Sequence, residues 1–333
     1  MERRMLPPGS VTVTRGLLGL ALGAGLCYCA YRAIVNKEKK KHVTGTGLLA
    51  RVSHMSVLEN VHTPGAVQLG NIPTSASNLE AHHLKALLDI LDSNAADSSI
   101  QERVLVTLGN SAAFSSNHDI IRNFNGIKII GRFISHPKTK AKALNALNNL
   151  SMNLENQEQI KDFLHDVCND ITSSPLNSEV QLAGLRLAIN MSVTNSYHEF
   201  LADYIPCFYT LLADGDKATQ IHTLKVLVNL SANPSMTTVL LSSKAPSSLA
   251  NLFGSKTNSD ILVRALTFAA NLSENYDRQM HSNRHHHYED HSLYVLLFRD
   301  QTAFKGNLVA LLQHPDTDIK EHVARLICPQ KLN

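Results

Sequence analysis

The chain lacks tryptophan, has few aromatic residues (5%) and contains only five cysteines. An odd number of cysteines at irregular spacing, in a chain long enough to bury a core, gives neither a disulfide framework nor a zinc-ligand pattern. Recognisable Ser-His-Asp arrangements, phosphate loops and paired carboxylates are missing as well. The sequence therefore predicts a reducing setting and a protein that is not an enzyme, with no cofactor and no metal site. The cysteines are Cys27, Cys29, Cys168, Cys207 and Cys328.

An excess of charge of one sign is found only in the N-terminal region. Charged residues make up 18% of the chain and the formal net charge is +3. Residues 1–78 hold nine Lys or Arg against three Asp or Glu, which leaves 22 basic and 25 acidic residues for the remainder. The remainder gives no global argument for nucleic-acid binding. We expect neither nucleic acid nor a small-molecule substrate as a partner.

A long hydrophobic run occurs once. Residues 16–31 carry no charge, and if Arg32 snorkels, the apolar length extends through Val35 to about the 20 residues that a bilayer requires. We predict an N-terminal lead at 1–15, a transmembrane signal anchor at 16–35 and a basic stop-transfer cluster at 36–41. That cluster keeps the C-terminal side in the cytosol. A cleaved secretory signal is the rival interpretation, but it lacks a small-residue cleavage pattern.

Two residue pairs in the predicted span bear on its surroundings. Gly19 and Gly23 have the small-xxx-small spacing that lets membrane helices pack closely, which would allow a homodimer through the span. Cys27 and Cys29 are candidates for acylation, against the simpler role of small apolar residues. A short, weakly hydrophobic span suits a thin bilayer, either the mitochondrial outer membrane or the endoplasmic reticulum, and the pattern leaves that choice open. Residues 42–78, with several Gly and Pro, are predicted as a flexible linker.

An internal repeat occupies residues 79–328. Five copies of a short apolar motif are centred on an Asn, and the Asn positions are separated by 39, 41, 39 and 42 residues. A Leu stands five residues before each Asn. Mostly helical repeats of this length indicate an α-solenoid. The Asn residues are Asn110, Asn149, Asn190, Asn229 and Asn271, and the leucines are Leu105, Leu144, Leu185, Leu224 and Leu266.

The clearest copy predicts an amphipathic helix. Ala143, Ala146, Leu147 and Leu150 follow the i, i+3, i+4, i+7 rule and form one apolar stripe. A helix of about three turns cannot bury such a stripe alone, so neighbouring helices must stack on it. Residues 316–328 have helical spacing but no Asn motif, which predicts a shortened terminal helix that covers the end of the stack.

The repeated motif resembles the third helix of an armadillo repeat, most clearly Ala-Leu-Asn-Ala-Leu-Asn-Asn-Leu-Ser at residues 143–151. Glu155-Asn156-Gln157 followed by Ile160 resembles the first helix of the next unit, and Tyr204-Ile205-Pro206 resembles the start of a second helix. The resemblance covers about residues 79–328. It implies an all-α, right-handed α-solenoid of armadillo repeats, preceded here by a single transmembrane helix.

With the anchor sequence at residues 17–29, the whole arrangement resembles the Armcx family of mitochondrial membrane-anchored armadillo proteins. That resemblance implies a scaffold on the cytosolic face of the mitochondrial outer membrane that acts in mitochondrial dynamics, distribution and trafficking. It also implies partners of the Miro and Trak kinds. The alternative is a soluble or endoplasmic-reticulum-associated armadillo adaptor that acts on cell growth, survival and transcription.

The column of Asn residues, called here the Asn ladder, is the candidate partner-binding site. Amides projecting from successive helices are able to bond both the N–H and the C=O of an extended peptide. The resemblance carries this role to Asn149, Asn190, Asn229 and Asn271, and less directly to Asn110. The alternative is that each Asn only satisfies a neighbouring helix end.

The positions one turn before the ladder refine this prediction. Nuclear-import adaptors of the armadillo fold carry a Trp there for lysine stems, and this chain has Val106, Asn145, Arg186, Lys225 and Thr267 instead. Arg186 and Lys225 add positive charge to the middle of the ladder, which favours an acidic partner segment. An ordinary solvated face is the alternative for both residues.

Two further motifs are given structural explanations. Four of the ladder residues also satisfy the N-glycosylation pattern N-x-S/T, but a cytosolic domain never meets that machinery, and the repeat accounts for the recurrence. Residues 277–291 are predicted as a His-rich insertion whose consecutive imidazoles are expected to be exposed rather than to form a metal site.

Overall fold

The computed structural model describes residues 79–93, 96–280, 287–299 and 302–327 of the chain, and all of them belong to one compact unit. These residues form helices and turns, with a single antiparallel bridge between Lys244 and Ser292 as the only β pairing among them. The predicted all-α solenoid is therefore confirmed. The predicted lead, span, basic cluster and linker, with Gly19 and Gly23, lie outside the described residues. None of the described helices has the length and apolar content needed to cross a bilayer.

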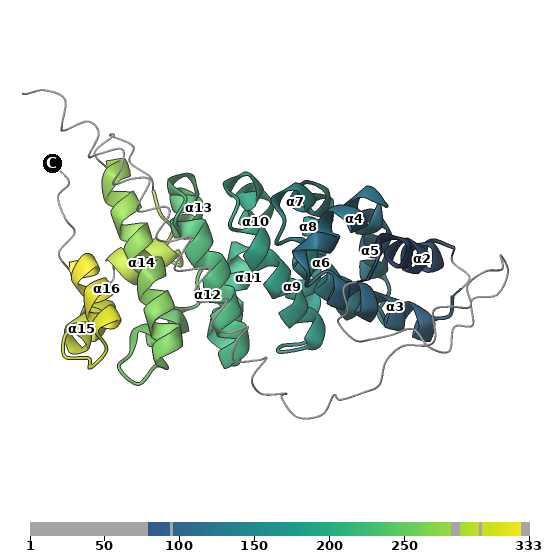
Figure 1. Ribbon diagram of the computed structural model, residues 1–333. Coiled ribbons are helices and arrows are strands. Elements are labelled where there is room, and N and C mark those ends of the chain that lie inside the picture. Colours follow the sequence, from purple (N-terminus) through teal and green to yellow (C-terminus); the bar gives the residue numbers. More distant parts are fainter. Residues whose placement is uncertain (1–78, 94–95, 281–286, 300–301, 328–333) are drawn as a thin grey trace, which may run out of the picture. The chain divides into compact units, whose positions relative to one another are not determined.

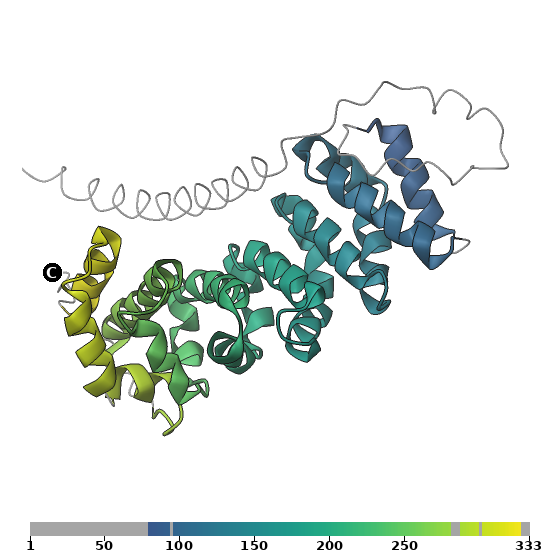
Figure 2. The same cartoon turned by 90° about the horizontal axis from the view of Figure 1, so that it is seen from below.

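The helices follow one another in space in their sequence order, from α2 at one end to α15 and α16 at the other (Figure 1). Each full repeat has a short first helix, a second helix and a longer third helix. The third helices pack side by side along the row, which Figure 2 shows from below. They are α3 (Ser98–Ser111), α6 (Lys140–Leu150), α9 (Glu179–Met191), α12 (Lys217–Ser231), α14 (Ser259–Met280) and α16 (Thr317–Ile327).

The first helices are short, and first and second helices are in places reduced to 3-10 turns. The first helices are α4 (His118–Asn123), α7 (Leu154–Ile160), α10 (His198–Ala202) and α13 (Thr237–Ser242), accompanied by the turns η2 (Ser115–Asn117), η4 (Lys161–Phe163), η5 (Asn195–Tyr197) and η6 (Pro234–Met236). The second helices are α2 (Ala81–Asp92), α5 (Gly126–Gly131) with η3 (Arg132–Ser135), α8 (Leu164–Ser173), α11 (Ile205–Asp214), η7 (Ser247–Phe253) and α15 (Thr302–Leu311). One turn of π-helix, η8 (Val295–Arg299), precedes α15.

Local sequence signals explain where these helices begin. The Asp97, Ser178 and Asp216 side chains accept hydrogen bonds from backbone N–H groups in the first turns of α3, α9 and α12, and so cap them. Asn125 adopts a left-handed conformation (φ 60°) between α4 and α5, a backbone region that Asn tolerates better than most residues. The first helix expected at Glu155–Ile160 and the second helix expected after Tyr204 are both present.

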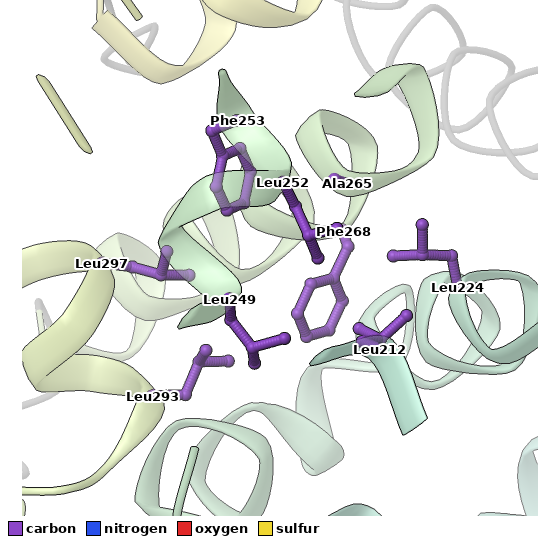
Figure 3. A pocket seen from close by; sticks show the side chains of 9 residues that line it. All are labelled: Leu212, Leu224, Leu249, Leu252, Phe253, Ala265, Phe268, Leu293 and Leu297. Atoms are coloured by element: carbon purple, nitrogen blue, oxygen red, sulfur yellow. The ribbon is translucent and has the colours of Figure 1, made fainter. Parts of the chain in front are cut away.

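The core lies between successive repeats. All five leucines that stand five residues before the ladder positions are fully buried, as the repeat predicts: Leu105, Leu144, Leu185, Leu224 and Leu266. Packing is less complete where η7 replaces a second α-helix. There a small cavity of about 10 Å³ is lined only by apolar side chains from α11, α12, η7, α14 and the segment around η8, as Figure 3 shows. Its size is about that of one water probe, and it offers no polar group, so it is a packing defect rather than a ligand site.

Buried polar side chains of the first helices satisfy the C-terminal ends of the third helices. Asn117 and His118 bond the carbonyls of Ser111 and Ala112 at the end of α3, at 2.9 and 2.7 Å. In the later repeats Asn156 and Gln157 bond Leu150 O and Ser151 O, and His198 bonds Ser192 O. The last carbonyls of a helix have no partner within it, so these side chains supply the missing donors.

The long helix α14 departs from this pattern. Thr237 stands where His118, Gln157 and His198 stand in the other repeats, and its buried hydroxyl finds no hydrogen-bond partner among the described residues. Asn275 of α14 instead donates to Ser231 O at 2.9 Å, and Gln279 donates to Pro234 O at 2.9 Å. These bonds explain why the helix continues through Met280, four residues into the segment predicted as the His-rich insertion.

Candidate functional site

The five residues of the Asn ladder occupy equivalent, half-buried positions near the C-terminal ends of five successive third helices. Those helices pack side by side (Figure 2), so the ladder positions follow one another from helix to helix along the row. The structure thus brings the predicted site residues into one line. They lie on α3, α6, α9, α12 and α14 as Asn110, Asn149, Asn190, Asn229 and Asn271, with Arg186 and Lys225 one turn earlier on α9 and α12.

Four of the ladder amides donate from Nδ2 to the preceding repeat. Asn190 Nδ2 bonds Ser151 Oγ and Asn148 O, both at 3.0 Å. Asn229 Nδ2 bonds Ser192 Oγ at 2.9 Å and Ile189 O at 3.3 Å. Asn271 Nδ2 bonds Ser231 Oγ at 3.1 Å. The amide nitrogen therefore links each repeat to the end of the one before it.

The serine of the Asn-x-Ser motif is the partner that the next repeat uses. Ser151, Ser192 and Ser231 are buried, and each hydroxyl donates to a carbonyl three residues earlier while it accepts from the next ladder amide. The first copy has Ala112 at this position, and there Asn149 Nδ2 bonds Gly109 O directly at 2.8 Å. The recurrence of an N-glycosylation pattern is thus explained by hydrogen bonding between repeats, and this role for the serines was not anticipated from the sequence.

The geometry supports the structural alternative for the amide nitrogens. Asn149, Asn190 and Asn229 bond carbonyls at the end of the neighbouring third helix, as that alternative expects. The proposed bonding of a partner peptide by the same amides stays a prediction.

We predict that the bond between repeats contributes measurably to stability. In a double-mutant cycle of Ser192→Ala and Asn229→Ala, the coupling free energy of unfolding should be about 0.5–1.5 kcal/mol, the usual net value of one hydrogen bond. The measurement is urea unfolding followed by circular dichroism. The control cycle pairs Ser192→Ala with Asn271→Ala, which contacts Ser231 instead, and should show no coupling. Additive effects in the first cycle would contradict the bond.

Cationic side chains lie beside the ladder and also connect repeats. Arg186 Nη2 donates to Asn145 Oδ1 at 2.8 Å, and Lys142 pairs with Glu179 at 2.8 Å. Burial lowers the pKa of the Arg186 guanidinium from its ordinary value, and the charge of Glu179 opposes that shift. An arginine side chain stays protonated in proteins, so positive charge is held at half-buried positions of α9 and, through Lys225, of α12.

Exposed apolar side chains extend the candidate site at its N-terminal end, and sequence reasoning missed them. Phe114, Met152 and Leu154 follow the third helices α3 and α6 by a few residues, and Leu154 is 66% exposed. Apolar residues in such short connections carry no periodic signal that separates an exposed from a buried side chain. We call these three side chains the apolar edge; they follow the first two rungs of the ladder in the sequence.

The buried histidine His198 of α10 makes the stability of the repeat domain sensitive to acid. His198 Nε2 donates to Ser192 O at 2.7 Å, and Asn233 Nδ2 donates to His198 Nδ1 at 3.1 Å, so the neutral ring fits its site. Desolvation lowers the pKa of His198, and the backbone bond to Ser192 only partly opposes this. A depressed folded-state pKa means that the stability present above the ordinary histidine value, about 6.5, is lost as the pH falls below it.

We therefore predict that the urea concentration at the midpoint of unfolding decreases when the pH is lowered from 7.5 to 5. The variant His198→Gln should lose part of this acid sensitivity, because Gln157 occupies the equivalent position in the preceding repeat and donates to Ser151 O without titrating. Some sensitivity should remain, since burial also lowers the pKa of His322. An identical pH dependence in the variant and the unchanged protein would exclude His198 as a contributor.

Candidate metal ligands are sparse in the described part of the chain. Glu80, His82 and His83 place one ligand atom each within 4.8 Å of one another at the start of α2. Glu80 and His82 are strongly exposed, and His82 Nδ1 lies 3.3 Å from Glu80 Oε2. Within the predicted His-rich insertion, residues 281–286 lie outside the described residues, and Asp290 pairs with Arg299 at 2.7 Å. Tyr288 of this insertion packs near Tyr276 of α14 and stacks on Tyr294, with ring centroids 6.2 and 4.1 Å apart.

Comparison with solved structures gives the same fold. A designed armadillo repeat protein, YIII(Dq)4CqI, is 15% identical with a TM-score of 0.60, and the similarity covers 73% of this chain and 97% of the designed one. A second, YIII(Dq.V1)4CPAF in complex with the peptide (KR)4, is 14% identical with a TM-score of 0.60 and coverage of 73% and 98%. An engineered protein solved by crystallography is 18% identical, with a TM-score of 0.58 and coverage of 73% and 94%.

The family comparison is made on the sequence. The model of the family described as Armadillo-like matches residues 79–298. That range includes α2 through α14, and with them all five rungs of the ladder. Because the match covers more than half of the chain, the chain belongs to the armadillo-like family.

Proposed function

We propose that this protein is a non-enzymatic interaction scaffold whose third helices hold an extended, acidic segment of a partner protein. Armadillo repeat folds are typically binding scaffolds rather than enzymes. The observation that carries the proposal is the alignment of half-buried amides on successive third helices with cationic side chains one turn away, at Arg186 and Lys225. Amides bond a peptide backbone irrespective of its sequence, and the cations select its side-chain charge.

The designed relatives support the use of this surface and differ in its charge. One of them was solved with the peptide (KR)4, which is basic. The present chain has no tryptophan and carries Arg186 and Lys225 beside its ladder. Like charges across an interface are repulsive, so a basic peptide is the wrong partner here and an acidic one is favoured.

The proposal is tested with two fluorescent peptides of opposite charge. The probe (Glu-Asp)4 should bind the full-length chain in an anisotropy titration, with an affinity that falls as salt rises, because screening weakens exposed charge pairs. The matched probe (Lys-Arg)4 should bind at least tenfold more weakly. Tighter binding of (Lys-Arg)4 would overturn the charge preference, and binding of neither peptide would overturn the groove as a peptide site.

We also propose that residues 16–35 anchor the scaffold in the mitochondrial outer membrane with the armadillo domain in the cytosol. The support is the apolar run and its basic flank, together with the resemblance to the Armcx family, which further implies trafficking adaptors of the Miro and Trak kinds as partners. A reporter fused to residues 1–41 should remain with mitochondria after carbonate extraction. A diffuse reporter would favour the soluble adaptor acting on growth and transcription, and reticular staining would favour the endoplasmic reticulum.

A further inference from the structure

We infer that the first helices α4, α7 and α10 form a second docking surface, which binds an amphipathic helix with basic residues from a partner protein. This surface is separate from the Asn ladder of the third helices, so the inference goes beyond the proposed function and is tested independently of it. The first helices lie along one edge of the row of repeats, where Figure 1 shows α4, α7, α10 and α13 in succession.

Large apolar side chains are exposed in these helices and in the connections that lead into them. The apolar edge, Phe114, Met152 and Leu154, stands where α3 connects to α4 and where α6 connects to α7. Phe200 of α10 is 47% exposed. Apolar side chains that are exposed together within a polar surface mark interaction sites. The proposed contacts of the ladder use none of these four side chains.

Contacts between neighbouring repeats bring the apolar side chains of α7 and α10 to the same side of the row. Leu154 and Glu158 are one helical turn apart on α7 and so share a face. The Tyr197 hydroxyl donates to Glu158 Oε1 at 2.5 Å, which joins the start of α10 to that face. Phe200 follows Tyr197 by three residues, which is again about one helical turn.

The charges on the first helices are mainly negative. Three exposed carboxylates each stand nine residues after a ladder residue and so occupy equivalent positions in successive repeats; this acidic row consists of Asp119, Glu158 and Glu199. Residues 118–123, 154–163 and 198–203 hold two Lys or Arg, Arg122 and Lys161, against six acids. The six acids are Asp119, Glu155, Glu158, Asp162, Glu199 and Asp203.

Both cations are already paired within the protein. Arg122 is only 16% exposed and pairs with Asp119 at 2.8 Å and with Glu155 at 2.6 Å, and Lys161 pairs with Glu158 at 2.8 Å. The carboxylate of Glu199 forms no ion pair with the residues that the structure describes. The surface thus presents negative charge next to apolar side chains, which is complementary to an amphipathic helix with Lys or Arg on its polar face.

The spacing of the repeats favours a helix over a strand as the occupant. Adjacent packed helices are separated by about 8–10 Å. Seven residues of an α-helix rise about 10 Å and return to nearly the same face, so side chains at i and i+7 meet equivalent positions of successive repeats. A strand covers that distance in about three residues, and its side chains at i and i+3 point to opposite faces. Of the two, the helix presents the same face to each repeat.

The test uses a fluorescent peptide of three heptads, (Leu-Lys-Lys-Leu-Leu-Lys-Leu)3, which as a helix has one apolar and one basic face. This helix probe should bind the full-length chain in an anisotropy titration, with an affinity that falls as salt rises. The peptide (Leu-Lys)10 alternates the same two residues, favours a strand and should bind at least tenfold more weakly. Equal binding of the two peptides would overturn the helical occupant, and a helix probe that does not bind would overturn the surface.

Two matched pairs of substitutions test where the helix probe binds. Leu154→Ser with Phe200→Ser removes apolar contacts and should weaken the probe at least tenfold. The control, Leu176→Ser with Val309→Ser, changes residues that are 50% and 61% exposed and lie outside the first helices. It should alter the affinity by less than about twofold. Thermal unfolding checks that both variants fold, and an equal loss of affinity in the two would contradict the inference.

Neutral substitutions test the charge of the acidic row. Glu158→Gln with Glu199→Gln should weaken the helix probe about tenfold, and glutamine retains an acceptor for the Tyr197 hydroxyl. The control, Asp166→Asn with Asp214→Asn, makes the same change in net charge on the second helices α8 and α11. It should weaken the probe by less than about threefold. If both pairs weaken it equally, the acidic row does not select the partner.

Two further outcomes separate this surface from the groove and from self-association. Arg186→Glu with Lys225→Glu should not weaken the helix probe, whatever it does to (Glu-Asp)4; a weakened helix probe would place the helix in the groove and overturn the inference. Sedimentation should give the same oligomeric state for the unchanged chain and for Leu154→Ser with Phe200→Ser. A smaller oligomer in the variant would make the surface an interface between copies of this chain, and the inferred partner helix would then be wrong.

Discussion

Reversing the charge at Arg186 and Lys225 is expected to weaken binding of (Glu-Asp)4 by about a hundredfold. Each substitution to glutamate replaces an attraction with a repulsion. We expect each to cost about 1.4 kcal/mol of binding free energy, since the charges are partly removed from water. The two side chains lie on adjacent third helices, α9 and α12, in the same register, so an extended segment passes both. The measurement is the anisotropy titration at low and physiological salt.

The control for this prediction has the same change in net charge away from the ladder. Lys128 and Lys305 are exposed residues of the second helices α5 and α15, and neither is part of the ladder. Lys128→Glu combined with Lys305→Glu should reduce affinity by less than threefold, through the long-range field alone. If the control pair weakens the probe as strongly as Arg186→Glu with Lys225→Glu, then binding is governed by net charge and the groove proposal is wrong.

Neutral substitutions distinguish loss of attraction from added repulsion. Arg186→Gln with Lys225→Gln should weaken the probe by about tenfold, between the unchanged chain and the reversed pair. Glutamine at position 186 also retains a donor for Asn145 Oδ1, which Arg186 bonds at 2.8 Å, so the packing of α9 on α6 is least disturbed in this variant. Thermal unfolding of every variant shows whether the fold is retained before affinities are compared.

The repeat allowed much of the fold to be predicted from the sequence. Every third helix repeats one register, so a leucine at one position in five copies predicts burial at all five, and all five are buried. The predicted terminal helix after Asp316 also has a local signal, its apolar periodicity, and it is present as α16. Properties that arise within one helix or one turn were accessible in this way.

Properties that arise between repeats could not be predicted from the sequence. Ser192 and Asn229 are separated by 37 residues, and only the packing of α9 against α12 makes them partners. The sequence displays both residues in every later copy, but it gives no means to tell a bond between repeats from a glycosylation pattern or a surface amide. The continuation of α14 through Met280 has the same origin, because Asn275 and Gln279 bond carbonyls of the preceding repeat.

The candidate site combines both kinds of property. The ladder positions follow from the repeat, and the structure brings them into line as expected. The bonds that Asn229 and Asn271 make to Ser192 and Ser231 depend on how the repeats pack, so they required the three-dimensional arrangement. The apolar edge formed by Phe114, Met152 and Leu154 also required it, because exposure is decided by what packs nearby.

Leu185→Ala is expected to destabilise the domain by about 3–5 kcal/mol. Leu185 is fully buried in α9, the third helix of the central repeat, and packs between neighbouring repeats. Removing most of a buried leucine side chain costs its transfer free energy plus a term for the cavity that remains. For a domain of this size, the midpoint of thermal unfolding should fall by about 10 °C.

The position of Leu185 in the row adds a second expectation. In a solenoid each repeat contacts mainly its neighbours, so stability is close to a sum of repeat and interface contributions. Weakening the central interface should broaden the unfolding transition or split it in two. The control Leu176→Ala truncates a side chain that is 50% exposed before α9, and it should change the free energy of unfolding by no more than about 0.5 kcal/mol. If Leu185→Ala unfolds at the midpoint of Leu176→Ala in a single sharp transition, the leucine column does not form the contacts on which the alignment of the ladder depends. The alignment of the ladder amides with Arg186 and Lys225 along the third helices would then need another explanation.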